Sequence, residues 1–211
     1  MELHKLSVEK TARVFTHGNP DAPEVWILLH GYGMLASQMI TAFEDIVSDH
    51  LFFIAPEGLS RFYWKGFEGP VVASWMTKED RQDEIDDYIK YLNQLIDTYQ
   101  LNTKKINVLG FSQGVATMSR WLSNNNLKLD KCVYWAGEPP ADIDYVHLFK
   151  RIHKAFFIYG NNDLFISETQ LSKITELLKP VLNQIEMIPF EGKHELNKEV
   201  LLKLITSNNS F

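Results

Sequence analysis

The sequence feature that most constrains the fold is a glycine–serine–glycine turn after a short apolar run. Gly110, Ser112 and Gly114 form the pattern G-x-S-x-G, directly after the apolar residues 106–109 and before a helical stretch. On a sharp strand-to-helix turn the serine backbone is strained, and side chains at the flanking positions would collide with neighbouring elements. The pattern alone also fits an ordinary glycine-bounded turn, so the surrounding elements decide between the two interpretations.

Buried-strand patterns alternate with helical patterns along most of the chain. The apolar runs expected to form buried strands are residues 25–29, 51–55, 106–109, 132–136, 155–159 and 184–188. The segments with helical spacing are residues 37–47, 77–99, 113–123, 145–152, 167–179 and 197–205, with Thr77 and Ser167 as expected N-caps. Short connections between buried strands are typical of a parallel sheet. We therefore predict an α/β fold with a mostly parallel central sheet and helices on both faces.

Two segments do not fit the alternation of buried strands and helices. Residues 6–14 alternate between apolar and polar side chains, which predicts one or two antiparallel strands at the N-terminal edge of the sheet. Residues 58–76 contain many aromatic side chains and no clear period, so we expect an irregular segment there. Because no linker or internal repeat is visible, one domain should span residues 1–211.

Composition and charge argue against several classes of function. The chain has 211 residues, of which 45% are hydrophobic, so it can bury a core. The formal net charge of −6 and the lack of a basic run argue against nucleic acid as a partner. No stretch approaches the ~20 apolar residues that a membrane span requires.

The N-terminus and the cysteine count bear on the expected compartment. The first residues contain no apolar signal segment, and the single cysteine, Cys132, cannot form an internal disulfide. We therefore expect a cytoplasmic protein in which Cys132 is a buried strand residue. Asn208-Asn209-Ser210 matches a glycosylation acceptor, but the match carries no weight without a secretion signal.

Three loops that follow predicted strands carry the residues that acyl transfer needs. Ser112 lies on the glycine-flanked turn. Asp163 follows the strand at residues 155–159, and His194 follows the last strand. The carboxyl ends of parallel strands meet at one edge of the sheet, where ligands bind. There the histidine would take the proton of the serine hydroxyl, and the aspartate would orient the imidazole. We therefore predict that Ser112, Asp163 and His194 are catalytic, in the chain order of an α/β-hydrolase.

Two other carboxylates compete for the role of Asp163. Asp142 and Asp144 follow the preceding predicted strand, where some hydrolases place their acid. Asp163 is favoured because it follows its own strand with no intervening spacer.

The other histidines are expected to be structural or exposed. His30 should pack or hydrogen-bond beneath the loop that follows the first buried strand. The remaining histidines, expected at the surface or at strand ends, are His4, His17, His50, His147 and His153. No metal-ligand cluster and no phosphate-binding loop occurs, so we predict neither a metal nor a cofactor.

Two backbone amides are candidates for an oxyanion hole. The N–H of Gln113 follows the serine at a predicted helix N-terminus. A second donor should come from the loop after the first buried strand, and the N–H of Tyr32 is the best candidate there.

The chain resembles the α/β-hydrolase superfamily and, within it, the small phospholipase/carboxylesterase group that includes acyl-protein thioesterases. The matching motifs are Leu29-His30-Gly31-Tyr32-Gly33, Ala55-Pro56-Glu57, Ser74-Trp75, Gly110-Phe111-Ser112-Gln113-Gly114, residues 160–163 and Glu191-Gly192-Lys193-His194. The resemblance implies hydrolysis of a carboxylic ester or thioester through an acyl-serine intermediate, without a cofactor. The group usually has a Val-Pro-like pair after its acid, whereas this chain has Leu164-Phe165-Ile166. Substrate identity therefore does not transfer.

The aromatic segment after the second buried strand should lie near the rim of the site. One hypothesis makes it the wall of an acyl pocket, built by Phe62, Trp64, Phe67 and Trp75. The alternative is a loop that packs its own aromatic side chains as a small separate cluster.

We expect a serine esterase or thioesterase that acts on small to medium acyl substrates, as a monomer or homodimer. Its activity should fall on acidification, because the histidine must be neutral to act as a base. The same residues could instead serve a C–C hydrolase, an amidase or a perhydrolase, which acyl-donor profiles would distinguish. A non-catalytic binding module on the same fold is a further alternative, but it would be expected to lack one of the three residues.

Overall fold

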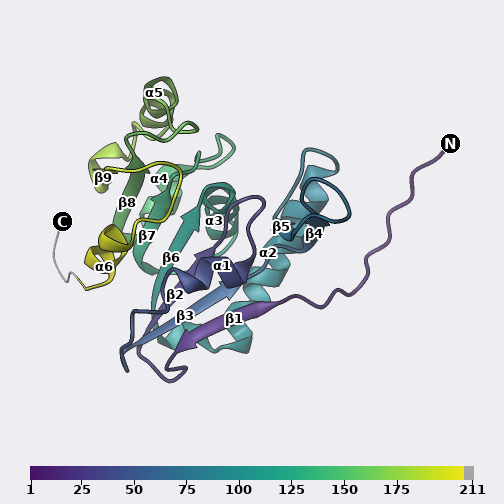
Figure 1. Cartoon of the computed structure of the whole chain (residues 1–211), viewed down its shortest axis with the longest axis horizontal. Coiled ribbons are helices and arrows are strands. Elements are labelled where there is room, and N and C mark those ends of the chain that lie inside the picture. Colours follow the sequence, from purple (N-terminus) through teal and green to yellow (C-terminus); the bar gives the residue numbers. More distant parts are fainter. Residues whose placement is uncertain (207–211) are drawn as a thin grey trace.

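A computed structural model describes residues 1–206 and shows a seven-stranded sheet with helices on both faces (Figure 1). The strands of this sheet are β1 (Val14–Gly18), β2 (Glu24–Leu29), β3 (Leu51–Pro56), β6 (Lys105–Phe111), β7 (Leu129–Trp135), β8 (Ile152–Gly160) and β9 (Ile185–Phe190). Their order is β1-β3-β2-β6-β7-β8-β9. Only β1 is antiparallel to its neighbour, so the predicted mostly parallel sheet with an antiparallel N-terminal edge is confirmed. The glycosylation pattern at residues 208–210 lies outside the described residues.

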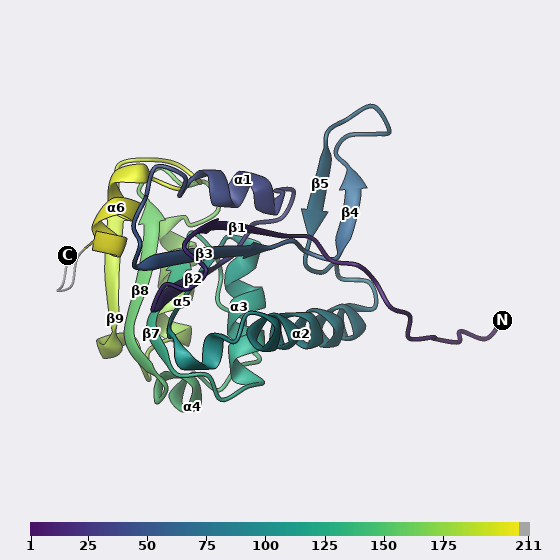
Figure 2. The ribbon, with the colours of Figure 1, turned by 90° about the horizontal axis from the view of Figure 1, so that it is seen from below.

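The helices form one layer on each face of the sheet (Figure 2). One layer consists of α1 (Ala36–Thr41) and α6 (Lys198–Thr206). The other consists of α2 (Arg81–Thr98), α3 (Gln113–Ser123), α4 (Tyr145–Phe149) and α5 (Glu168–Leu177). Two short 3₁₀ turns, Leu101–Thr103 and Leu182–Gln184, precede β6 and β9. No helix within residues 1–206 is both long and apolar enough to cross a membrane.

Each face of the sheet has its own hydrophobic core, because neighbouring side chains of a strand point to opposite faces. In β2, Val25, Ile27 and Leu29 pack in the core shared with α2 and α3. Trp26 and Leu28 pack in the core shared with α1 and α6. All five side chains are fully buried, which explains why the strand is apolar at consecutive positions.

The strand predicted before β1 does not form. Residues 6–12 have no regular structure, and pairing with the sheet begins at Val14. This segment instead leaves the sheet edge and passes the base of a hairpin (Figure 2). Lys5 donates hydrogen bonds to Asp80 and Asp83 near the start of α2, and Lys10 donates one to the carbonyl of Leu59. Apolar–polar alternation was misleading here, because no neighbouring strand pairs with the segment.

Residues 58–76, expected to be irregular, contain an antiparallel hairpin of β4 (Ser60–Tyr63) and β5 (Val71–Ser74). The hairpin projects from the body of the molecule (Figure 2). Its connection is tightened by hydrogen bonds from the Trp64 N–H to the Pro70 carbonyl and from the Gly69 N–H to the Gly66 carbonyl, both 2.9 Å. The two strands have only four residues each, which is too short for a clear sequence period.

The helix predicted from Thr77 begins four residues later. α2 starts at Arg81, after Asp80, which has a positive φ of 44°. Thr77 does not cap the helix, because its hydroxyl donates to Oε2 of Glu84 at 3.1 Å. The sequence pattern located the helix but misassigned its first turn.

Helix α1 is shorter than predicted. It ends at Thr41, whereas helical spacing continues to residue 47. The chain continues in tight turns in which the Phe43 N–H donates to Ile40 and the Glu44 N–H donates to Thr41. By contrast, the N-cap predicted at Ser167 is confirmed, since its hydroxyl accepts from the Gln170 N–H at 3.3 Å.

Candidate active site

Ser112 lies on a sharp turn between β6 and α3. Its backbone has φ 52° and ψ −117°, which residues other than glycine rarely adopt. Its N–H donates to the Trp135 carbonyl at 2.9 Å, which holds the turn against β7. A Cβ on Gly110 would lie 2.5 Å from the Gly114 carbonyl oxygen, and one on Gly114 would lie 2.1 Å from that of Leu29. Close backbone approach therefore explains both glycines of the pattern.

The side chains of Ser112, His194 and Asp163 form a chain of hydrogen bonds. His194 Nε2 lies 2.9 Å from Ser112 Oγ, and His194 Nδ1 lies 2.8 Å from Asp163 Oδ2. The three residues follow β6, β9 and β8, whose carboxyl ends lie at one edge of the sheet. In this geometry a neutral imidazole donates through Nδ1 to the carboxylate and accepts the serine proton at Nε2. The structure thus brings the three sequence-predicted residues together.

Asp163 is held by backbone donors of its own loop. Its side chain is fully buried, and its Oδ1 accepts from the N–H of Phe165 at 2.7 Å and from that of Ile166 at 3.2 Å. The other oxygen, Oδ2, is left for His194. One carboxylate oxygen is therefore anchored, and the other holds the imidazole.

The loops after β8 and β9 are joined through their backbones. The Asn161 N–H donates to the Phe190 carbonyl and the Asn162 N–H donates to the Gly192 carbonyl, both at 2.9 Å. A Cβ on Gly160 would lie 2.5 Å from the Gly192 carbonyl oxygen, so glycine is required for this approach. The distance between the acid and the histidine is consequently set by backbone contacts.

Two aromatic rings flank the imidazole of His194. The ring centroid of Phe165 lies 4.7 Å from that of the imidazole, and the centroid of Phe111 lies 5.1 Å from it. Trp135 Nε1 donates to the carbonyl of Glu195 at 2.9 Å, which fixes the loop directly after the histidine. Phe165 is 70% exposed, so an apolar side chain covers His194 at the rim of the site.

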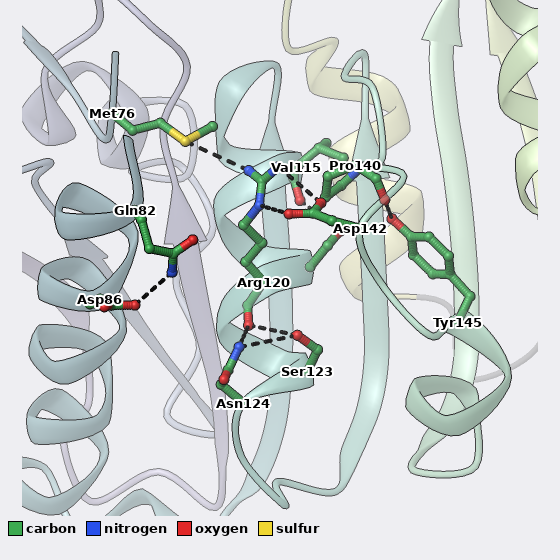
Figure 3. Close-up of polar contacts among 11 residues, drawn as sticks. Met76, Gln82, Asp86, Val115, Arg120, Ser123, Asn124, Pro140, Asp142 and Tyr145 are labelled. Atoms are coloured by element: carbon green, nitrogen blue, oxygen red, sulfur yellow. Dashed lines mark hydrogen bonds and ion pairs between the residues drawn. The ribbon is translucent and has the colours of Figure 1, made fainter. Parts of the chain in front are cut away.

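The two competing carboxylates are committed to other contacts. Asp142 Oδ2 and Oδ1 each lie 3.0 Å from the buried guanidinium of Arg120, whose Nη1 contacts Met76 Sδ (Figure 3). The hydrogen bonds from Arg120 hold the pKa of Asp142 below its ordinary value. Asp144 caps α4 by accepting from the His147 N–H at 3.0 Å. Of these three carboxylates, only that of Asp163 is bonded to His194 within the described residues.

The two predicted amide donors lie beside the serine. Within residues 1–206, neither the Tyr32 N–H nor the Gln113 N–H donates to a protein acceptor. Gln113 is the first residue of α3, where helix N–H groups lack intrahelical acceptors. The loop that carries Tyr32 approaches closely, since a Cβ on Gly31 would lie 3.1 Å from the Ser112 Cβ. Both N–H groups therefore lie on segments next to Ser112 and have no acceptor within the described residues.

His30 supports this loop from below, as predicted. It is fully buried, its Nδ1 lies 2.7 Å from the Gly31 carbonyl oxygen, and its Nε2 accepts from the Gly58 N–H at 2.9 Å. Burial lowers the pKa of His30 to about 4, although the hydrogen bond to Gly31 opposes the shift. A neutral imidazole with its proton on Nδ1 satisfies both contacts.

A cleft of about 770 Å³ opens at Ser112 and His194. It extends over the N-terminus of α3 toward α5 and the loop after β7. Its apolar lining includes Ala116, Pro139, Pro140, Phe165, Ile166 and Leu177, and its polar lining includes Arg81, Gln113, Arg120, Glu138, Asp142 and Gln170. None of the four aromatic residues proposed from sequence as a pocket wall lines this cleft.

Three of those aromatic residues belong to the hairpin region. The rings of Phe62 and Trp64 pack against the ring of Tyr32, with centroids 5.5 and 5.8 Å away. Phe67 lies in the β4–β5 connection, contacts Tyr63 and is 92% exposed. The hairpin thus packs its own aromatic side chains and those of the neighbouring loop, which is the arrangement of the alternative interpretation.

Trp75, the fourth of them, is buried beneath the Tyr32 loop. It is 2% exposed, its ring stacks on His30 at 5.0 Å, and its Nε1 donates to the His30 carbonyl at 2.9 Å. It also contributes to a separate cleft of about 720 Å³, between the N-terminal segment and α2. Its contacts are those of a support for the loop.

Sequence reasoning missed two polar side chains near the site. The amide of Gln113 binds the segment that follows β5, and the guanidinium of Arg120 binds Asp142. The signal available for Arg120 was its charge, the only one among the buried residues of α3. No group of three or more His, Cys, Asp or Glu side chains within residues 1–206 is arranged to hold a metal ion.

The fold matches solved structures of esterases at low sequence identity. Acyl-protein thioesterase 2 of Zea mays is 19% identical, with a TM-score of 0.68 over 92% of this chain and 96% of that one. The Bacillus cereus carboxylesterase is 18% identical, with a TM-score of 0.66 over 92% and 91%. A phospholipase/carboxylesterase of Dyadobacter fermentans is 17% identical, with a TM-score of 0.64 over 95% and 98%. At such identities the similarity establishes the α/β-hydrolase fold.

No curated protein sequence matches the chain. The model of the phospholipase/carboxylesterase family, however, matches residues 10–209, which include every strand of the sheet and all three hydrogen-bonded side chains. The chain therefore belongs to the phospholipase/carboxylesterase family.

Proposed function

We propose that this protein is a serine hydrolase that cleaves carboxylic esters or thioesters through an acyl-serine intermediate. The observation that carries the proposal is the hydrogen-bonded chain from Ser112 Oγ through His194 to Asp163, with distances of 2.9 and 2.8 Å. Membership of the phospholipase/carboxylesterase family supports the same chemistry.

The first step is attack of the serine on the acyl carbonyl carbon. Ser112 Oγ forms a bond to the carbon while its proton passes to His194 Nε2. The imidazolium that results is stabilised by Asp163 Oδ2, which holds the proton on Nδ1. The imidazolium then gives its proton to the leaving alcohol or thiol, and the acyl group stays on the serine. Water, deprotonated by the same histidine, releases the acid and restores the enzyme.

The tetrahedral intermediate needs donors aimed at its negatively charged oxygen. The N–H groups of Tyr32 and Gln113 are the candidates, because they lie on the two segments next to Ser112 and have no acceptor within the described residues. Gln113 adds the partial positive charge of the α3 N-terminus.

The cleft supports an acyl substrate of small or medium size. Its volume of about 770 Å³ is within the usual range for small-molecule sites. Phe165, Ile166 and Leu177, from α5 and the segment before it, give the cleft an apolar side. We assign the acyl chain to this side. The family and the structures it resembles include both carboxylesterases and a thioesterase, so either leaving group fits the proposal.

The experiment is hydrolysis of p-nitrophenyl esters from acetyl to decanoyl, together with thioesters of the same acyl chains. We expect turnover by the wild type and a fall in kcat of roughly 10⁴- to 10⁶-fold in Ser112→Ala. Ser123→Ala is the matched control, because its hydroxyl bonds only within the end of α3 and should leave turnover unchanged. The absence of turnover of every ester and thioester by folded wild type would contradict the proposal.

A further inference from the structure

The two candidate oxyanion donors come from segments that are far apart in the sequence. Tyr32 lies in the loop after β2, and Gln113 lies at the start of α3, directly after β6 and Ser112. β2 and β6 are adjacent parallel strands, and Leu29 is paired with Gly110. The sheet therefore brings the two segments side by side. It does not fix the irregular loop that carries Tyr32, which needs contacts of its own.

Strand β5 and the residue that follows it, Trp75, supply those contacts on both sides of Tyr32. The Gly33 N–H donates to the Ala73 carbonyl at 2.9 Å. The Trp75 indole N–H donates to the His30 carbonyl at 2.9 Å. Ala73 and Trp75 are 0% and 2% exposed, so both hydrogen bonds are shielded from water. The backbone around the Tyr32 N–H is consequently held by one hydrogen bond at Gly33 and by another at His30.

The side chain of Gln113 holds Trp75 and Met76, the two residues that follow β5. Its Oε1 accepts from the Trp75 N–H at 3.0 Å, and its Nε2 donates to the Met76 carbonyl at 2.8 Å. The Ser74 hydroxyl lies 3.3 Å from both atoms of the amide. Because the primary amide offers a donor and an acceptor in one plane, it matches a backbone N–H and a backbone carbonyl at the same time. An apolar side chain of the same size cannot replace it.

These contacts form a closed path between the two donors. Gln113 offers one donor through its backbone and binds the segment after β5 through its side chain. β5 and that segment in turn bind the loop that offers the Tyr32 N–H. We propose that the Gln113 side chain is a positioning group that sets the spacing of the Tyr32 and Gln113 amides through β5. This inference rests on the proposed function, since it assigns a catalytic purpose to that spacing.

The predicted consequence is specific to the transition state. Oxyanion donors act when they lie about 2.7–3.1 Å from the charged oxygen, and losing one donor costs roughly 10²- to 10³-fold in kcat. A loosened loop keeps the donor but misplaces it, so the loss should be smaller, roughly 10- to 100-fold. Binding of the uncharged substrate depends little on these amides, so KM should change by less than about threefold.

The first test replaces Gln113 with methionine, which has a similar volume and lacks the amide. Steady-state kinetics on one ester should show the fall in kcat with little change in KM. Hydrogen exchange followed by mass spectrometry should show faster exchange in the peptides that cover residues 29–35 and 71–76. The matched control is Gln82→Met, since Gln82 is exposed and its side chain donates to Asp86, one turn along α2 (Figure 3). It should match the wild type in both measurements.

A second variant tests the same path without touching Gln113. Trp75→Phe keeps an aromatic ring over His30 but removes the indole N–H that binds the His30 carbonyl. It should lower kcat by a similar factor for every acyl chain length and speed exchange in residues 29–35. A change in chain-length preference instead would make Trp75 a pocket wall and overturn the assignment.

Hydrogen exchange separates this inference from the proposed function. If Gln113→Met folds and its exchange in residues 29–35 equals that of the wild type, the positioning role is overturned, whatever the enzyme hydrolyses. If that exchange rises while kcat is unchanged, the spacing has no catalytic purpose and the role is also overturned. If the wild type hydrolyses no ester or thioester, the proposed function fails and takes with it the catalytic purpose assigned here. Faster exchange in Gln113→Met would then support only the contact through β5.

Discussion

The loops that carry Ser112, Asp163 and His194 line the cleft, whereas the β4–β5 hairpin does not, and the two regions are held in different ways. The three loops are fixed by backbone contacts so close that Gly114 and Gly160 could not carry a Cβ. The hairpin projects from the body and is held by ring contacts and a few hydrogen bonds at its base (Figure 2). Its connection leaves open space around Gly66, although a Cβ on Gly69 would lie 1.7 Å from the Trp64 carbonyl oxygen.

The two regions should therefore tolerate substitution differently. Backbone contacts at the edge of the sheet define the positions of reacting groups, and substitution there should affect chemistry and folding together. At the hairpin tip, an exposed side chain such as that of Phe67 contacts solvent, and its truncation should affect neither. The junction at Ser74–Met76 belongs to both regions, because Gln113 and Arg120 of α3 both bind it.

After the loss of the serine itself, the largest effect should come from the carboxylate that holds the imidazole. We expect Asp163→Asn to lower kcat by roughly 10⁴-fold, because the amide favours the wrong imidazole tautomer. Asp144→Asn is the matched control, since asparagine caps a helix as well as aspartate does. Ester hydrolysis at saturating substrate measures both. Equal activity of Asp163→Asn and the wild type would show that Asp163 is not the acid.

A glycine-to-alanine pair tests the contrast between the two regions directly. In Gly114→Ala the new Cβ would lie 2.1 Å from the Leu29 carbonyl oxygen, so we expect a loss of about 3 kcal/mol or more in the free energy of unfolding. Gly66→Ala meets no atom within 4 Å and bears only the strain of its φ of +106°, about 1–2 kcal/mol. Urea denaturation gives both values. A larger loss of stability at Gly66 than at Gly114 would contradict the contrast between the two regions.

The buried imidazole beneath the Tyr32 loop predicts a dependence of stability on pH. The pKa of His30 is lowered to about 4 by burial, so an unfolded chain takes up this proton at a higher pH than the folded chain. Stability should therefore fall as the pH drops from about 6.5 to about 4, by roughly 3 kcal/mol in total. Above pH 7, His30 should make no contribution to the change of stability with pH.

The variant His30→Gln isolates this contribution, because its amide can still accept from the Gly58 N–H. Urea denaturation at several pH values should give a smaller slope between pH 6.5 and 4 than in the wild type. Identical slopes would mean that His30 is not the group that titrates in this range.

The smallest effect should be found at the hairpin tip. Phe67 is 92% exposed, so Phe67→Ala should change the free energy of unfolding by less than about 0.5 kcal/mol. Its kcat/KM for acetyl and decanoyl esters should equal that of the wild type. A selective loss on the decanoyl ester would show that the tip contacts long acyl chains and would weaken the contrast drawn here.

The sequence predicted the loops at the carboxyl ends of the strands well, because the constraints on these loops are local. Fully buried strands read as apolar runs, and the elbow needs small residues at Gly110 and Gly114 wherever it occurs. The chain order of Ser112, Asp163 and His194 then follows from strands that alternate with helices. The structure supplied what no spacing contains, which is that Asp142 is bonded to Arg120 rather than to His194.

The sequence predicted the hairpin region poorly because its structure depends on distant contacts. Its two strands of four residues are too short to show a clear alternation in the sequence. The aromatic residues around them would look the same in the sequence whether they formed a pocket wall or a packed cluster. The burial of Trp75 depends on His30, 45 residues away, and on Gln113, 38 residues away. The first turn of α2 was misplaced for a similar reason, since Thr77 is bonded to Glu84.

The central claim is that Ser112 is the nucleophile. The most direct test is to label the folded wild type with a fluorophosphonate probe and to map the adduct by peptide mass spectrometry. We predict one label per chain, on Ser112, and its loss in His194→Ala, because the base that activates the hydroxyl is gone. A label on another residue, or no label on a wild type that hydrolyses esters, would contradict the account.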